Sequence, residues 1–177
     1  MCGTQKAFGG TKTVPRKIAF IGKIGTGKTT LADYLVKQYG FKKLSFADAV
    51  KDMAIRYFGM TTKDRKLLQT IGTKMREVDP DVWVRIVTTK LDYGPYLHVV
   101  IDDCRFLNEA KALKERGFVL VRLVGEHKEV TPEQSQHLSE TEQDKIFADY
   151  TLDTTKPLEE TYRELDEIVK RKWNIVG

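Results

Sequence analysis

Cysteine is scarce in this sequence of 177 residues, and its scarcity bears on the cellular compartment. Cys2 and Cys104 are the only two. The first lies in an expected tail and the second in an expected turn between a strand and a helix. Such a pair does not predict a disulfide framework. We therefore expect a reducing, cytoplasmic location.

Long apolar runs and clusters of basic residues are also missing. No apolar stretch approaches the roughly 18 residues that a membrane span requires, and the N-terminus has no apolar core typical of a signal peptide. The net charge of +5 is small, and basic residues are interleaved with acidic ones. We therefore expect neither a membrane nor a nucleic acid as a partner.

The composition that remains is typical of a folded protein, with 41% apolar and 31% charged residues. Residues 1–15 are rich in Gly, Thr and Lys and have no periodicity, which predicts a flexible N-terminal extension. Residues 16–177 are expected to form one domain, because the length suits one and no internal repeat is present.

Short apolar runs alternate with amphipathic stretches along this domain. Residues 47–92 look mainly helical, with breaks predicted at Gly59, Gly72 and Asp79-Pro80. Strands that are apolar on both faces, most of them followed by a helix, predict an α/β fold in three layers, with a five-stranded parallel sheet between helices. The predicted strands are 17–21, 41–46, 97–101, 118–124 and 149–152, and the other predicted helices are 28–39, 106–116 and 157–173.

A P-loop pattern is the strongest motif in the chain. It runs Gly22-Lys23-Ile24-Gly25-Thr26-Gly27-Lys28-Thr29, directly after one predicted strand and directly before a predicted helix. Its glycines let backbone N–H groups converge on a phosphate, and the start of the helix adds partial positive charge. The residues expected to hold ATP are Gly22, Lys23, Gly25, Thr26, Gly27, Lys28, Thr29 and Thr30.

Acidic residues follow the predicted strand 97–101. A P-loop site usually needs a carboxylate for its metal, often at the end of a neighbouring apolar strand. Asp102 and Asp103 stand at such a position, so that Thr29, Asp102 and Asp103 are the expected ligands of Mg²⁺. Helix capping is the alternative role for such a pair. Arg105 follows closely and is expected to face the transferred phosphate, with a solvated helix start as its alternative.

The surrounding sequence favours a small-molecule kinase over other P-loop proteins. Thr89-Lys90-Leu91-Asp92 superficially matches a guanine-reading element, but it precedes the acidic strand end. Asp102-Asp103 also lacks the catalytic glutamate that motor-type ATPases and helicases place beside the metal aspartate. We expect residues 46–92 to form an insertion that binds the acceptor, and residues 125–147 to form a lid that excludes water.

Several further segments resemble the deoxynucleoside monophosphate kinases of bacteriophages and large DNA viruses. This resemblance implies a fold like that of nucleoside monophosphate kinases and Mg²⁺-dependent transfer of the γ-phosphoryl of ATP to a deoxynucleoside monophosphate for DNA precursor synthesis. Phosphomevalonate kinase is the alternative small-molecule kinase, and an ATPase module acting on a macromolecule is a different class. The matching segments are 46–51, 68–76, 79–84, 100–110 and 137–140.

The acceptor side is predicted with less support from local pattern. The expected catalytic residues are Lys28, Arg76, Asp103 and Arg105. Arg76 is included because its planar guanidinium group suits a monophosphate. The alternative role for Arg76 is a surface ion pair with Glu77 or Asp79. Trp83 is expected either to stack on the substrate base or to belong to the core. No arginine lies between Arg122 and Arg163, which departs from many nucleotide kinase lids. The sequence leaves the oligomeric state open, with a homodimer as one option. The expected substrate-binding residues are Asp48, Lys51, Arg76, Trp83, Arg105, His137 and Glu140.

Overall fold

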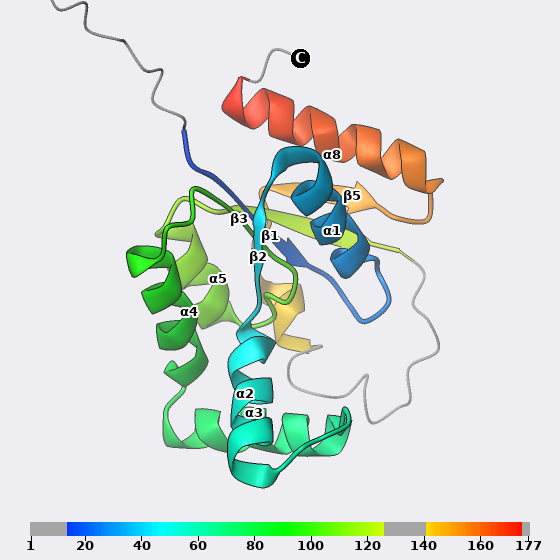
Figure 1. The fold of residues 1–177 in the computed structure, drawn as a ribbon. Helices are drawn as coiled ribbons and strands as arrows, with labels where there is room; N and C mark the ends of the chain where they lie inside the picture. Colours follow the sequence, from blue (N-terminus) through cyan, green and yellow to red (C-terminus); the bar gives the residue numbers. More distant parts are fainter. Residues whose placement is uncertain (1–13, 126–140, 175–177) are drawn as a thin grey trace, which may run out of the picture.

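Five parallel strands form a single sheet at the centre of the protein (Figure 1). The computed structural model describes residues 14–125 and 141–174. The order across the sheet is β2-β3-β1-β4-β5, which confirms the predicted five-stranded parallel sheet. The strands are β1 Arg16–Ile21, β2 Lys42–Leu44, β3 His98–Ile101, β4 Val119–Val124 and β5 Tyr150–Asp153.

Helices cover both faces of the sheet, because alternate residues of its central strand are apolar on each side. Ile18 and Phe20 of β1 face one cluster of buried residues, while Ala19 and Ile21 face another. The first cluster includes residues of α1 (Lys28–Tyr39) and α8 (Leu158–Trp173). The second includes residues of α2 (Phe46–Phe58), α3 (Arg65–Val78), α4 (Val82–Tyr93) and α5 (Leu107–Lys114). The predicted three-layer α/β fold is therefore confirmed.

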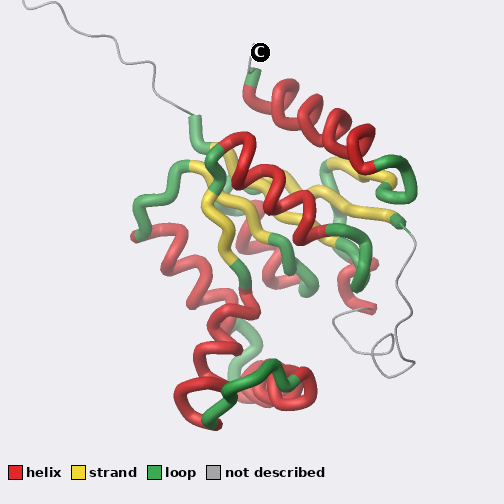
Figure 2. The backbone as a smooth tube through the Cα atoms, turned by 45° about the vertical axis from the view of Figure 1, so that its right-hand side comes forward, coloured by secondary structure: helices red, strands yellow, loops and turns green. Residues whose placement is uncertain are grey.

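The α2 and α3 helices extend beyond the sheet as a helical projection (Figures 1 and 2). Ser45 begins α2, because its side chain accepts a hydrogen bond from the Ala47 amide at 3.2 Å. Asp64 begins α3 in the same way, with a 2.9 Å bond from the Leu67 amide. The strand predicted at 41–46 is consequently shorter, since Phe46 already belongs to α2.

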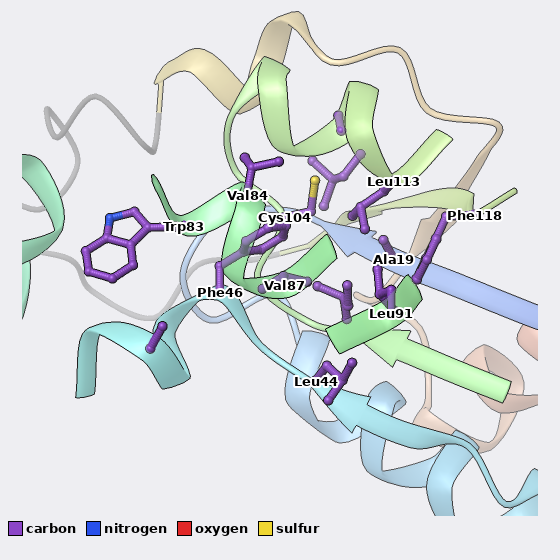
Figure 3. Packing of buried hydrophobic residues seen from close by; sticks show 14 of the residues in the cluster. Ala19, Leu44, Phe46, Trp83, Val84, Val87, Leu91, Cys104, Leu113 and Phe118 are labelled. Carbon is purple, nitrogen blue, oxygen red and sulfur yellow. The ribbon is translucent and has the colours of Figure 1, made fainter. Parts of the chain in front are cut away.

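The predicted helix breaks at Gly59 and at Asp79-Pro80 are confirmed, but the break at Gly72 is wrong. Gly72 is buried within α3, and its carbonyl oxygen accepts a hydrogen bond from the Trp83 indole at 3.1 Å. Glycine costs a helix interior only about 1 kcal/mol relative to alanine. Tertiary packing of α3 against α4 outweighs that cost. Figure 3 shows Trp83 with Val84 and Val87 of α4 in the buried cluster.

An aromatic cluster fastens the C-terminal helix to the helix that follows the P-loop. The Asp166 carboxylate of α8 accepts hydrogen bonds from the Tyr34 hydroxyl at 2.9 Å and from the Tyr39 hydroxyl at 2.7 Å. Tyr34 also stacks on Tyr162, with ring centroids 4.0 Å apart.

Across residues 14–125 and 141–174, no helix combines the length and apolar character needed to cross a membrane.

Candidate active site

A cleft of about 760 Å³ opens beyond the ends of β1, β2 and β3. Its volume falls within the usual range for small-molecule sites. The P-loop forms one wall, and α2 with α3 forms the wall that belongs to the helical projection. Its lining comprises Ile24, Gly25, Gly27, Lys28, Thr29, Thr30, Ser45, Phe46, Ala47, Val50, Lys51, Lys63, Arg65, Leu68, Gln69, Gly72, Thr73, Arg76, Asp102, Asp103, Arg105, Phe106 and Glu109.

The P-loop has the shape that its glycines allow. A Cβ atom on Gly22 would lie 2.7 Å from the Thr26 Oγ1 and 2.9 Å from the Leu123 carbonyl oxygen, so that a side chain does not fit there. Gly27 has a φ of 89°, in the left-handed region. Lys28 Nζ donates hydrogen bonds to the Gly22 and Lys23 carbonyl oxygens at 2.5 and 2.7 Å. The lysine therefore lies within the loop, at the start of α1.

Thr29 and Asp102 offer two oxygen ligands beside the P-loop. Thr29 Oγ1 donates a hydrogen bond to Asp102 Oδ2 at 3.2 Å, so that the hydroxyl and the carboxylate lie close together. Such oxygens suit Mg²⁺, which keeps several waters and binds through one or two carboxylates with phosphates. Lys43 Nζ lies 3.0 Å from Asp102 Oδ2 and forms an ion pair with this carboxylate. Within the described part of the chain, no group of three or more His, Cys, Asp or Glu residues could hold a metal by itself.

Asp103 lines the cleft and is hydrogen-bonded to the start of α2. Its carboxylate accepts hydrogen bonds from the Ser45 hydroxyl at 2.6 Å and from the Phe46 and Ala47 amides at 3.0 and 2.8 Å. Both oxygens are thus used at the start of α2, and burial raises the pKa of this carboxyl. Because successive side chains point to opposite sides of an extended chain, Asp102 lies beside Thr29 while Asp103 turns toward α2. These contacts give Asp103 a capping role at the start of α2, and its metal and catalytic roles stay a prediction.

Arg76 lies at the cleft, and neither surface pairing considered for it is present. Its Nη2 lies 3.2 Å from Glu109 Oε1, and its Nη1 donates to the Gly72 carbonyl oxygen at 3.1 Å. The guanidinium carbon stands 4.0 Å from the centre of the Phe106 ring. Glu77 instead pairs with Lys74, and Asp79 pairs with Arg85.

Glu109 is a site residue that sequence reasoning missed. Its side chain is only 2% exposed. Oε2 accepts hydrogen bonds from the Arg105 and Phe106 amides at 2.9 and 3.1 Å. Burial raises the pKa of this carboxyl to about 7. A glutamate in the first turn of a helix is an ordinary capping signal, and nothing local indicates that it also reaches Arg76.

The remaining predicted acceptor residues occupy different surroundings. Lys51 lines the cleft with Arg105, and it pairs at 3.3 Å with Asp48. Asp48 is about half exposed and is not among the lining residues. His137 and Glu140 lie outside the described residues, as does most of the predicted lid. The last residues of the predicted lid are described and contact β4. Arg122 Nη2 of β4 donates hydrogen bonds to the Gln143 and Ile146 carbonyl oxygens at 3.0 and 2.6 Å. These bonds hold the short 3₁₀ helix η1 (Gln143–Lys145).

The prediction that Trp83 stacks on a substrate base is wrong. Its side chain is 1% exposed and lies in the core, where the indole donates its hydrogen bond to Gly72. Trp83 is absent from the cleft lining. The core alternative is therefore the correct one.

Replacing Trp83 by phenylalanine tests this core role. We expect Trp83→Phe to lower the free energy of unfolding by about 1–2 kcal/mol, because the Gly72 carbonyl oxygen loses one of its donors and the smaller ring leaves space. Urea unfolding measures this change. An unchanged unfolding midpoint together with a raised acceptor KM would instead support base stacking.

Comparisons with known proteins agree with this fold. No family model matches the chain. A protein of Acanthamoeba polyphaga mimivirus, named "Putative deoxynucleotide monophosphate kinase", is 31% identical over 84% of this chain and 93% of its own. The uncharacterized protein ORF77 of Ictalurid herpesvirus 1 is 33% identical over 59% of this chain and 50% of its own.

Solved structures of P-loop kinases share the fold. A gluconokinase from Sinorhizobium meliloti superposes with a TM-score of 0.55 at 18% identity, covering 92% of this chain and 96% of its own. A shikimate kinase from Aquifex aeolicus superposes with a TM-score of 0.50 at 16% identity, covering 88% and 97%. With the P-loop cleft and the viral relative, these likenesses lead to one conclusion: the chain belongs to the deoxynucleotide monophosphate kinase family of large DNA viruses and has the fold of P-loop kinases.

Proposed function

We propose that this P-loop kinase transfers the γ-phosphoryl group of ATP to a deoxynucleoside monophosphate, giving the diphosphate for DNA precursor synthesis. One observation carries the proposal: a single cleft is lined both by the P-loop and by arginines, among them Arg76 and Arg105. Donor and acceptor phosphates would therefore meet in one place, as phosphoryl transfer requires. The name of the mimivirus relative supports the same acceptor class.

On the donor side, the P-loop amides and Lys28 would bind the ATP phosphates. Thr29 and Asp102 would hold Mg²⁺, which neutralises developing charge on the phosphates. Lys28 lies at the N-terminus of α1, where the helix dipole also favours an anion. The proposed donor half thus consists of residues of the P-loop, the start of α1 and the end of β3.

On the acceptor side, Arg76 would bind the monophosphate. A guanidinium has five N–H donors, and Arg76 uses only some of them on Gly72 and Glu109. Its guanidinium lies over the Phe106 ring, a contact that favours the charged group at this place. Leu68 and Val50 would supply apolar surface for the base and sugar, with Gln69 as a polar group beside them. The wall of α2 and α3 is therefore the proposed acceptor-binding insertion.

A coupled assay of ADP release tests the acceptor directly. We expect turnover that depends strictly on dTMP, dGMP, dCMP or dAMP, compared with their ribonucleotide forms and with phosphomevalonate. ATP hydrolysis without any acceptor, or hydrolysis stimulated by DNA, would support an ATPase module instead. If no deoxynucleoside monophosphate is turned over above background, the proposal fails. Turnover of phosphomevalonate alone would replace the proposed acceptor with that metabolite.

A further inference from the structure

Glu109 contacts two of the three arginines that line the cleft, the Arg76 side chain and the Arg105 backbone. One carboxylate oxygen lies 3.2 Å from Arg76 Nη2 on α3, and the other accepts the amides of Arg105 and Phe106. The contact between Arg76 and Glu109 joins residues that are 33 positions apart in the sequence. A single buried carboxylate thus sets the relative positions of the α3 wall and the segment after β3.

The surroundings of Arg76 leave its orientation dependent on Glu109. The guanidinium is held from three directions: by the Gly72 carbonyl oxygen, by the Phe106 ring and by the Glu109 carboxylate. Among these, only the carboxylate is charged, and charge-assisted hydrogen bonds are about twice as strong as neutral ones. The Glu109 carboxylate is therefore the contact that fixes the orientation of the Arg76 guanidinium group.

We propose that Glu109 is a positioning residue, which holds Arg76 in the orientation that binds the phosphate of the acceptor monophosphate. This inference rests on the proposed function, because it assigns Arg76 to the acceptor. Glu109 itself would not touch the substrate: it is 2% exposed and its oxygens are already occupied by Arg76 and two amides. Its removal should weaken acceptor binding and leave ATP binding unchanged.

The charge on Glu109 gives this role a dependence on pH. Burial is the main cause that raises the pKa of Glu109 to about 7, the negative charge of Asp103 adds to the rise, and Arg76 opposes it. The buried thiol of Cys104 is a further titratable neighbour. The ionised carboxylate is the form that holds Arg76. Acceptor binding should therefore weaken as the pH falls through 7, where Glu109 takes up a proton.

The first test compares Glu109→Gln with a matched variant, Glu77→Gln. Glu77 is an exposed carboxylate that follows Arg76 on α3 and pairs with Lys74 at 2.8 Å. With the monophosphate that wild type uses best, Glu109→Gln should raise the acceptor KM on the order of tenfold. The ATP KM should stay within about twofold, and Glu77→Gln should change neither constant. An unchanged acceptor KM in Glu109→Gln would overturn the inference.

A double-mutant cycle separates positioning from general damage to the fold. Arg76→Lys keeps the charge but removes the planar fork. If Glu109 acts through Arg76, adding Glu109→Gln to Arg76→Lys should raise the acceptor KM no more than about twofold further. Multiplication of the two single effects would mean that Glu109 acts independently of Arg76, which overturns the inference.

The pH profile of the acceptor KM provides a readout even if Glu109→Gln does not fold. The acceptor phosphate titrates with a second pKa of about 6, and the profile of Arg76→Lys supplies that baseline. Wild type should show an additional rise in acceptor KM between about pH 8 and pH 6. Equal profiles in wild type and Arg76→Lys would overturn the positioning role alone. Absence of turnover with every monophosphate would overturn the proposed function, and this inference with it.

Discussion

Lys28→Ala is expected to lower kcat/KM on the order of 10³-fold, because the P-loop lysine neutralises charge on the transferring phosphate. In the structure this lysine is 8% exposed and donates to two P-loop carbonyl oxygens. The substitution therefore removes a charge that is already in position. Steady-state kinetics with ATP and the preferred acceptor measure the loss.

Lys37 provides the matched control for this experiment. It is an exposed lysine in the last turn of the same helix, α1. Lys37→Ala should keep wild-type kinetics, and both variants should keep the far-ultraviolet circular dichroism of the folded protein. Full turnover by folded Lys28→Ala would contradict the role assigned to the P-loop.

Asparagine at positions 102 and 103 should have opposite consequences. Asp102→Asn is expected to lower kcat on the order of 100-fold with little loss of stability, because Asp102 is the proposed metal ligand. Asp103→Asn is expected to lower the free energy of unfolding by about 2 kcal/mol, since an amide has one oxygen for the three donors of Ser45, Phe46 and Ala47. Urea unfolding and kcat should be measured on both variants.

Dependence on Mg²⁺ makes the comparison sharper. Asp102→Asn should require a higher Mg²⁺ concentration for half-maximal turnover, whereas folded Asp103→Asn should keep the wild-type requirement. The reverse pattern would exchange the two assignments. Lys43, which lies 3.0 Å from Asp102, should lose this ion pair only in the first variant and keep its pair with Asp33 in both.

Features with a local cause were predictable from the sequence. The strand before Gly22 and the helix after Lys28 follow from apolar periodicity, and the parallel sheet follows from strands that are apolar on both faces. The helical character of the segment between β2 and β3 also follows from periodicity. The P-loop needs residues that are neighbours in sequence, so that its pattern was visible without the fold.

Features that depend on distant contacts could not be predicted in the same way. The separation of roles between Asp102 and Asp103 depends on which side chain points toward α1 and which toward α2. The pairing of Arg76 with Glu109 joins two helices that no periodicity relates. Gly72 stays within α3 because Trp83, from another helix, packs on it. Each of these outcomes was decided by tertiary packing over local preference.

The central place of β1 in the sheet governs how the chain can fold while it is being synthesised. β1 is made early, yet both of its neighbours, β3 and β4, come much later: Arg16 bonds to His98 across 82 positions. Until those strands leave the ribosome, the apolar run of β1 has no partner, and such long-range pairing is slow. A fragment that ends before His98 would contain every P-loop residue and still lack both supports of the strand that carries the loop. Triphosphate binding should therefore appear late in synthesis, although its motif is translated early.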